Sequence, residues 1–272
     1  MYAISQDNLS LAWRDALNLL VDHGGKAVHL AVAIQRPADA EDESVRAILD
    51  AFIDERRSAG AKLWPISTVA NTSFPAAFYR PGVDNARQRL YELHAKAQRM
   101  QQRMRGPENY FNRLVAYPVP GSEPFNQLEY VVDRLINQRK PRKGGRGGAL
   151  SSAYEVGFTT DGGDLRIQAP GQDRNTMGFP CMSHISFTLE HDVLNLAALY
   201  RNQHFVARAY GNYVGLARIG GFIAQEVGVE LGEVLCLATH ADAQLQDFGK
   251  ARVERLAAAA RDATDPVQVL SA

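Results

Sequence analysis

The chain has 272 residues, 46% of them hydrophobic and 22% charged, and its 30 basic and 30 acidic side chains leave no net charge. This composition is typical of a globular protein, and the neutral balance argues against a stable nucleic-acid partner or binding to acidic membranes. With neither a basic-apolar leader nor an apolar run of membrane-span length, we expect no membrane partner and a cytoplasmic location. Two cysteines alone, Cys181 and Cys236, exclude a disulfide framework.

The first 140 residues read as helices with one early strand. Apolar residues recur at helical spacing over 9–22, 41–57 and 128–136, and 84–105 reads as a long polar helix. Alternating apolar residues predict a strand that starts near Val28 and ends before Pro37. The stretch 64–81 has neither period and is expected to be loop-like or extended. The helix at 128–136 leads into a basic, glycine-rich loop, RKPRKGGRGG (139–148).

The second half alternates between predicted strands and helices. Strands are expected at about 149–158, 164–168, 183–190, 193–200 and 232–239, with helices at about 212–228 and within 248–263. Because hairpin-like neighbours mix with helices, the order indicates an α+β fold rather than repeated βαβ units. No segment has the composition of an interdomain linker, so we predict a single domain over residues 1–272.

The stretch GFPCMSHISF (178–187) places Cys181 directly after a proline, at the start of a predicted strand. A nucleophilic cysteine needs its sulfur held at a fixed point and its thiolate made available, which this position would favour. The alternative is that Cys181 is a small buried apolar residue, as free cysteines often are. For Cys236, which lies among apolar neighbours in VLCLAT, we favour that second interpretation.

Four features in chain order resemble the thymidylate synthase and pyrimidine hydroxymethylase family, most clearly over residues 108–245. ENYFNRLVAYP (108–118) is similar to the family's Y-G-x-x-x-R-x-W/Y-P segment, and the Pro-Cys pair at Cys181 to its catalytic Pro-Cys. Arg201 and Asn212 have the spacing of the family's phosphate-binding arginine and pyrimidine-reading asparagine. The run NYVGLARIGGFIAQEVGVELGEV, which begins at Asn212, resembles the helix and strand that follow in the family.

The resemblance implies a three-layer α+β fold, with a mixed β-sheet flanked by helices, and a homodimer packed sheet to sheet. It implies a methyltransferase or hydroxymethylase of nucleotide biosynthesis, which transfers a one-carbon unit from 5,10-methylenetetrahydrofolate to C5 of a uracil nucleotide (dUMP or UMP). Cys181 would add to C6 of the ring, because C5 is a poor nucleophile until a thiolate has added beside it. The alternative is a catalytically altered homologue that binds a pyrimidine nucleotide monophosphate without folate chemistry.

The resemblance also implies substrate-binding residues. Arg201 would bind the nucleotide phosphate close to the sulfur, where a cation favours the thiolate. Asn212 would read the uracil edge with its amide donor and acceptor, although asparagine is also a common helix N-cap. Arg142 and Arg146 of the basic loop would reach the phosphate bound by the partner subunit. A solvated loop and a short RNA contact are the alternatives for that segment.

Several positions depart from the family pattern. Met182 follows the nucleophile in place of histidine, and Ser186 stands where a glutamine supports the nucleotide. His204 replaces the folate-facing aspartate and could serve as a general base, or be an ordinary hydrogen-bonded histidine. The family's closing C-terminal segment is replaced by an alanine-rich helix. By counting, the sugar-reading D-x-H-x-Y becomes His240, Asp242 and Gln244.

We expect no metal site. A third possibility is an unrelated cysteine hydrolase, in which Cys181 pairs with His184, His204 or His240. No local protease or acyltransferase signature accompanies these residues, so this possibility has little support from the sequence.

Overall fold

The computed structural model describes residues 1–103, 109–119, 121–139, 154–155 and 181–264. Its strands form one sheet in the order β1-β2-β7-β5-β4-β3, with β6 paired to β7. The pairing is mixed: β1–β2, β7–β5 and β7–β6 are parallel, and the other pairs are antiparallel. The strands are β1 (Tyr2–Gln6), β2 (Lys26–Ile34), β3 (Tyr154–Glu155), β4 (Met182–Glu190), β5 (Val193–Tyr200), β6 (Gln203–His204) and β7 (Glu230–Asp242).

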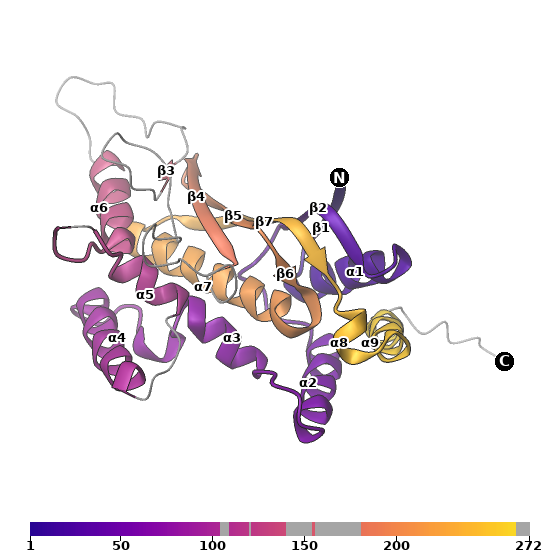
Figure 1. The fold of residues 1–272 in the computed structure, drawn as a ribbon. Coiled ribbons are helices and arrows are strands. Elements are labelled where there is room, and N and C mark those ends of the chain that lie inside the picture. The colour runs from indigo at the N-terminus through magenta and orange to yellow at the C-terminus, as the bar shows by residue number, and fades with distance from the viewer. Residues whose placement is uncertain (104–108, 120, 140–153, 156–180, 265–272) are drawn as a thin grey trace.

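Helices cover one face of this sheet (Figure 1). The mixed sheet flanked by helices confirms the predicted α+β class. Within the described ranges, no helix has both the length and the apolar character needed to cross a membrane. The helices are α1 (Leu9–Asp22), α2 (Glu43–Ser58), α3 (Ile66–Ser73), α4 (Ala86–Arg103), α5 (Tyr110–Val115), α6 (Gln127–Arg139), α7 (Tyr210–Val227), α8 (Leu245–Phe248) and α9 (Lys250–Asp262), with a 3₁₀ turn at Ala76–Phe78 and a π-helical turn at Phe205–Ala209.

The helices and strands predicted within the described ranges are confirmed to within a few residues, and the structure also contains β6 and α8, which were not predicted. The stretch 64–81, expected to be a loop, contains α3 and the 3₁₀ turn. This expectation was wrong because α3 is short and has no side-chain cap, so its stability comes from packing rather than from local signals. β1 and α5 were not predicted. The strand expected at 164–168, and most of the one at 149–158, lie outside the described residues.

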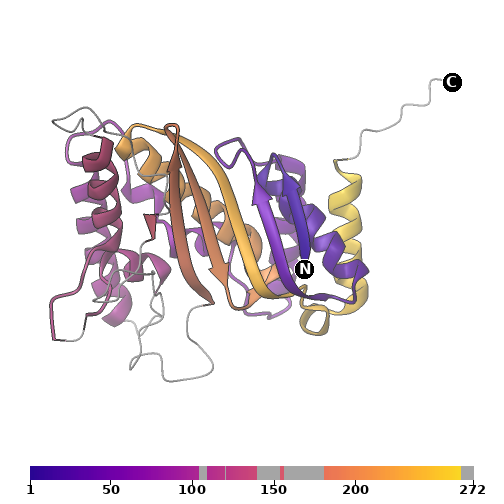
Figure 2. The ribbon, with the colours of Figure 1, turned by 90° about the horizontal axis from the view of Figure 1, so that it is seen from above.

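Helices cover the two faces of the sheet to different extents. On β7, Val234, Cys236 and Ala238 are buried beneath the helices, whereas Leu235 and Leu237 point to the opposite side and are only partly buried. Figure 2 views the sheet from that opposite side, and none of the described helices crosses its strands there. We call this side the open face. The burial of Cys236 confirms our interpretation of that residue as structural.

The buried helix α7 lies against the sheet, and α3 crosses it closely. Glycines permit this approach: a Cβ at Gly211 would lie 2.6 Å from the Cβ of Val69 and 2.9 Å from the carbonyl oxygen of Ile66. A Cβ at Gly215 would lie 2.6 Å from the Cβ of Ser73. The position of α3, and of the residues just before it, therefore depends on the absence of side chains on this face of α7.

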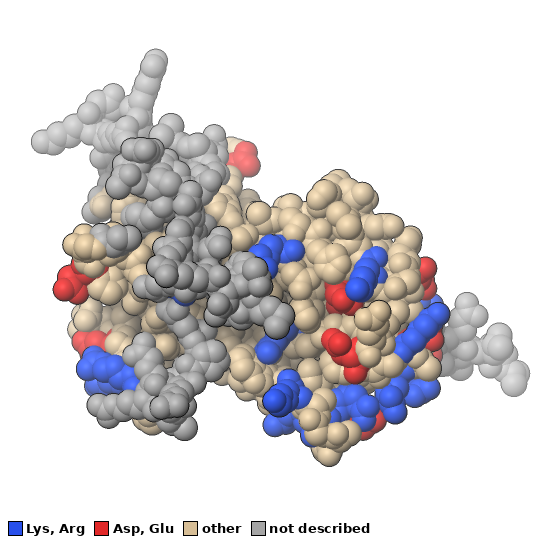
Figure 3. All heavy atoms as spheres, in the orientation of Figure 1, with Lys and Arg blue, Asp and Glu red and all other residues tan. Residues whose placement is uncertain are grey.

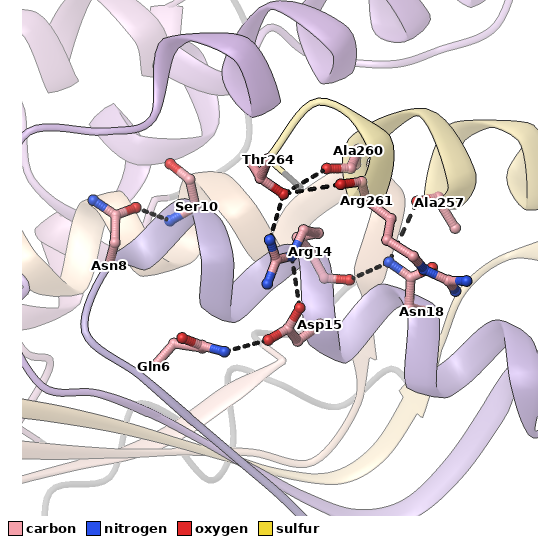
Figure 4. Close-up of polar contacts among 10 residues, drawn as sticks. All are labelled: Gln6, Asn8, Ser10, Arg14, Asp15, Asn18, Ala257, Ala260, Arg261 and Thr264. Carbon is pink, nitrogen blue, oxygen red and sulfur yellow. Dashed lines mark hydrogen bonds and ion pairs between the residues drawn. The ribbon is translucent and has the colours of Figure 1, made fainter. Parts of the chain in front are cut away.

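The alanine-rich helix α9 docks on α1 through a polar network (Figure 4). The side chain of Asn18 donates to the carbonyl oxygens of Arg14, at 2.9 Å, and of Ala257, at 3.3 Å. Arg261 donates back to the side chain of Asn18, and Arg14 donates to Thr264. These contacts make α9 part of the structural core around α1.

Charges of both signs share the surface (Figure 3). Basic side chains gather at the lower right of the view, where Figure 1 places α2 and α9. Acidic neighbours partner several of them: Arg57 lies 3.2 Å from Asp54, and Lys250 lies 3.7 Å from Glu254. Exposed pairs of this kind contribute little to stability, so we regard this surface as an ordinary solvated one.

Replacing Gly211 by alanine should destabilise the protein by about 1–3 kcal/mol, because the new methyl group overlaps Val69 and the backbone of α3. Gly221→Ala on the same helix is the matched control, since a Cβ there meets no atom within 4 Å. That change should stabilise the helix by about 0.5–1 kcal/mol. Urea unfolding measures both, and equal effects of the two substitutions would contradict the close-contact explanation.

Candidate active site

Cys181 and Arg201 lie side by side because the backbone pairs them. The N–H of Arg201 donates to the carbonyl oxygen of Cys181 at 3.0 Å. This bond continues the antiparallel ladder of β4 and β5, in which Met182 is opposite Tyr200. The adjacency of thiol and arginine that the family resemblance implied is therefore present in the fold.

A tyrosine holds the other side of the cysteine backbone. The hydroxyl oxygen of Tyr110 accepts the N–H of Cys181 at 3.2 Å and that of Met182 at 3.4 Å. Tyr110 is the first residue of α5, whose preceding residue Asn109 caps the helix by accepting the N–H of Asn112 at 2.7 Å. No role was predicted for Tyr110 from the sequence. Its position as the first tyrosine of ENYFNRLVAYP (108–118), where the family motif begins, was the feature that could have indicated one.

The thiol of Cys181 is partly buried, and this burial raises its pKa. The positive charges of Arg201 and then Arg208 act in the opposite direction and lower it, but the net change is upward. In the free protein, desolvation thus outweighs both cations. Arg201 favours the thiolate as expected, without being sufficient to make it the main form at neutral pH.

Arg208 is a second cation of the site that the sequence analysis missed. It belongs to the π-helical turn before α7, and the carbon of its guanidinium lies 4.1 Å from the ring centroid of Trp64. Burial lowers the pKa of Arg208, while Tyr110 and Cys181 raise it. A π-helical turn has no characteristic sequence period, and Trp64 lies in the stretch that we expected to be loop-like. The contact between Arg208 and Trp64 therefore could not be predicted from the sequence.

Asn212 is buried in the first turn of α7. The alternative that it serves as a helix N-cap is wrong, because the capping position is Ala209 and the π-helical turn precedes it without a side-chain cap. In the described part of the chain, the side-chain amide of Asn212 makes no hydrogen bond. The amide is therefore uncommitted and can pair with a ligand.

Two further predicted residues lie near the π-helical turn. His204 ends β6 and immediately precedes this turn. His240 on β7 hydrogen-bonds through Nδ1 to the side-chain oxygen of Asn202 at 2.8 Å. Neither histidine, nor His184, hydrogen-bonds to Cys181 in the structure, which gives the cysteine-hydrolase alternative no geometric support.

The remaining counted positions serve the protein itself. Asp242 accepts the N–H of Gln244 at 2.6 Å and lies 3.6 Å from the ammonium of Lys26. The buried side chain of Gln244 accepts the N–H of Ala207 at 2.9 Å, within the π-helical turn. These two residues thus support the turn that carries Arg208, and a sugar-reading role for Asp242 stays a prediction.

Ser186 lies on β4, too far from the thiol of Cys181 to contact it directly. Its neighbours Ile185 and Phe187 are buried under the helices, so its own side chain is on the open face. Five residues of strand separate it from Cys181, about 16 Å at 3.3 Å per residue. Its support of the nucleotide stays a prediction. Arg142 and Arg146 lie outside the described residues.

Comparison with known proteins supports the family resemblance. No family model matches the chain. A protein of Methanocaldococcus jannaschii named "Putative thymidylate synthase" is 25% identical over 124 residues, 46% of this chain and 49% of the relative. A protein of Methanococcoides burtonii with the same name is 24% identical over 125 residues, again 46% of this chain and 49% of the relative.

Over this part of its length the chain is a divergent relative of these two proteins. It spans about half the length of the curated relatives that it matches. Their low identity is consistent with the mixture seen at the site, where the thiol, the first arginine and the asparagine match the family pattern while the residues around them have changed.

Cys181 should react with iodoacetamide in the native protein, whereas Cys236 should not. Cys236 is fully buried, its pKa is raised to about 12 by burial, and its sulfur accepts a hydrogen bond from Gln203. Because burial also raises the pKa of Cys181, its alkylation rate should rise with pH to a midpoint above about 8.5, the value of a free cysteine. Intact-mass spectrometry follows both sites, with Cys181→Ser as the control. A midpoint below that of a cysteine peptide would contradict this picture.

Proposed function

We propose that the protein transfers a one-carbon unit, methyl or hydroxymethyl, from methylenetetrahydrofolate to C5 of a uracil nucleotide (dUMP or UMP). The reaction proceeds through a covalent adduct on Cys181. The observation that carries this proposal is the backbone-fixed pairing of Cys181 with Arg201, which sets a nucleophile beside a phosphate-binding cation. The two relatives named as thymidylate synthases support the same chemistry.

The covalent step uses the sulfur of Cys181 as nucleophile. A bond forms between Sγ and C6, and the C5–C6 π electrons move onto C5 and O4, which turns C5 into a nucleophile. The uncommitted amide of Asn212 donates to O4 as charge develops there and accepts the N3–H of the ring. After the one-carbon unit joins C5, the C5 proton leaves and the bond between the transferred carbon and its carrier breaks. A methyl product would need a hydride, which the folate could supply when bound, whereas a hydroxymethyl product would need water at the same carbon. Elimination of the thiolate then restores the ring double bond.

Tyr110 supports this step by holding the cysteine still. Its hydroxyl oxygen accepts two backbone N–H groups at the start of β4, and its own hydrogen remains available to donate into the site. Burial raises the pKa of Tyr110, so the hydroxyl stays protonated at neutral pH. A neutral donor of this kind orients a ligand without adding a negative charge beside the thiolate.

The residues around the π-helical turn fit a flat cofactor. Trp64 is 37% exposed beside Arg208 and offers an aromatic surface to a planar ring. His204 adjoins the same turn at the position where the family has its folate-facing residue. When bound, methylenetetrahydrofolate supplies the one-carbon unit; Trp64 and His204 would help to hold it.

The second candidate is a catalytically altered homologue that binds a pyrimidine nucleotide without folate chemistry. Two observations favour it. Burial keeps the thiol of Cys181 mainly protonated in the free protein, and Asp242 and Gln244 use their polar groups within the protein. Such a protein would retain Arg201 and Asn212 as a nucleotide site and lack turnover.

We also propose that two copies of the chain pack sheet to sheet through the open face. Partly buried Leu235 and Leu237 on β7, together with Leu199 on β5, place apolar side chains on that face. Covering them would remove apolar area from water. In such a dimer, Arg142 and Arg146 would approach the phosphate bound by the partner.

A 5-fluoro-dUMP adduct tests the main proposal. In the presence of methylenetetrahydrofolate, the wild-type protein should gain the mass of both compounds. The hydrogen at C5 can leave as a proton, but the fluorine that replaces it cannot leave as a cation, so the adduct cannot break down. Cys181→Ser should gain neither, and Cys236→Ser is the matched control that should behave as wild type. Intact-mass spectrometry gives the result.

Full turnover by Cys181→Ser would exclude the covalent mechanism. Calorimetry distinguishes the second candidate from the first. If the nucleotide binds, folate does not enhance its binding and no adduct forms, the result would favour the catalytically altered homologue.

Leu237→Asp should convert the dimer to a monomer, because it buries a charge at the centre of the apolar contact. Light scattering after size-exclusion chromatography measures the change, and Gln225→Asp, at an exposed site on α7, is the control that should stay dimeric. A wild-type monomer at micromolar concentration would contradict the sheet-to-sheet proposal.

A further inference from the structure

Arg208 is held in place by structure that has no other evident purpose. It lies in a π-helical turn, a rare conformation that is frequent at functional sites. The N–H of its neighbour Ala207 donates to the side chain of Gln244, which is itself in the left-handed region at φ 61°. A non-glycine residue is kept in that conformation only when its surroundings enforce it. The turn is therefore well determined.

The ring beneath Arg208 is equally well determined. Trp64 directly precedes the N-cap of α3, and α3 is positioned by its close contact with Gly211 of α7. Gly211 follows the π-helical turn by two residues. One helix–helix contact thus fixes both partners of the stack, in which a guanidinium lies 4.1 Å from an indole centroid.

Arg208 also has no acidic partner in the described part of the chain. Two other partly buried arginines do: Arg46 pairs with Glu41 and Asp50, and Arg87 contacts three carboxylates. The groups that respond to the charge of Arg208 are instead Tyr110 and Cys181. A partly buried cation without a carboxylate is costly unless another negative charge forms nearby, and here the candidate is the thiolate.

Four titratable or charged groups act on Cys181 in the described ranges: Tyr110, Tyr200, Arg201 and Arg208. Burial raises the pKa of both tyrosines, so they are uncharged at neutral pH. Under the proposed function, substrate phosphate pairs with Arg201 and cancels most of its effect on the sulfur. Among the described residues, Arg208 is then the remaining full charge that acts on the thiol.

We propose that Arg208, held against the ring of Trp64, is the positioning cation that keeps Cys181 reactive once substrate phosphate has paired with Arg201. The two arginines divide the work: one binds the anion, and the other favours the thiolate. This inference rests on the proposed function in one respect, the binding of substrate phosphate by Arg201. The effect of Arg208 on the thiol does not require a nucleotide.

The test is the pH dependence of Cys181 alkylation by iodoacetamide, with and without inorganic phosphate. Arg208→Gln should move the midpoint of the profile upward by about 0.5–1 pH unit, and so lower the rate at pH 7 about three- to tenfold. Arg208→Lys should restore most of the loss, and Trp64→Leu should shift the midpoint less, in the same direction. Arg218→Gln is the matched control, since Arg218 is a partly buried arginine of α7 that bonds to Asn71.

Phosphate should raise the midpoint further in Arg208→Gln than in wild type, and Arg201→Gln should not respond to phosphate. An Arg208→Gln profile that superimposes on wild type would overturn the proposal, as would an equal shift in Arg218→Gln. If Arg208→Gln unfolds the protein, buried Cys236 will also be labelled. In that case the profiles of Arg208→Lys and Trp64→Leu test the proposal instead. If Arg208→Gln raises the midpoint as expected but no adduct forms with the fluoronucleotide, the proposed function would be wrong and this inference would stand.

Discussion

One backbone hydrogen bond, from the N–H of Arg201 to the carbonyl of Cys181, organises the candidate site. It joins two residues twenty positions apart, where β4 begins and β5 has just ended. Independently, Tyr110 of α5 accepts the N–H groups of Cys181 and Met182, so the cysteine backbone is held from two sides. A nucleophile held in this way needs little reorganisation before it reacts, which is the general advantage of preorganised sites.

The contact of α3 with α7 positions the second cation that acts on the thiol. Glycines on α7 let α3 approach, and this approach sets Trp64 under Arg208. Burial works against these cations, since it raises the pKa of the thiol they would ionise. The site therefore balances desolvation, which makes a thiolate more nucleophilic once formed, against two charges that help it to form.

Much of this architecture was legible in the sequence. Periodic apolar residues predicted α1, α2 and α6, and alternation predicted β2, β4, β5 and β7, because these elements bury one face each. The helix α4 was predicted from a long polar stretch, and α7, also predicted, is buried on most of its sides. Cys181, Arg201 and Asn212 were selected because their order and spacing match the family that the chain resembles. The sequence could not reveal α3 or the stack of Arg208 on Trp64, because both depend on tertiary contacts that lack a local pattern. Nor could spacing show that Gln244 supports the π-helical turn, since its partner Ala207 lies 37 positions away.

Addition of the Cys181 thiolate to C6 of uracil must make the hydrogen at C5 exchangeable, whether or not folate is present. Proton NMR in D₂O follows the H5 signal of dUMP or UMP directly. We expect the signal to fade in the presence of wild-type protein and to persist with Cys181→Ser. Persistence with both proteins, under conditions where the nucleotide is bound, would contradict covalent catalysis by Cys181.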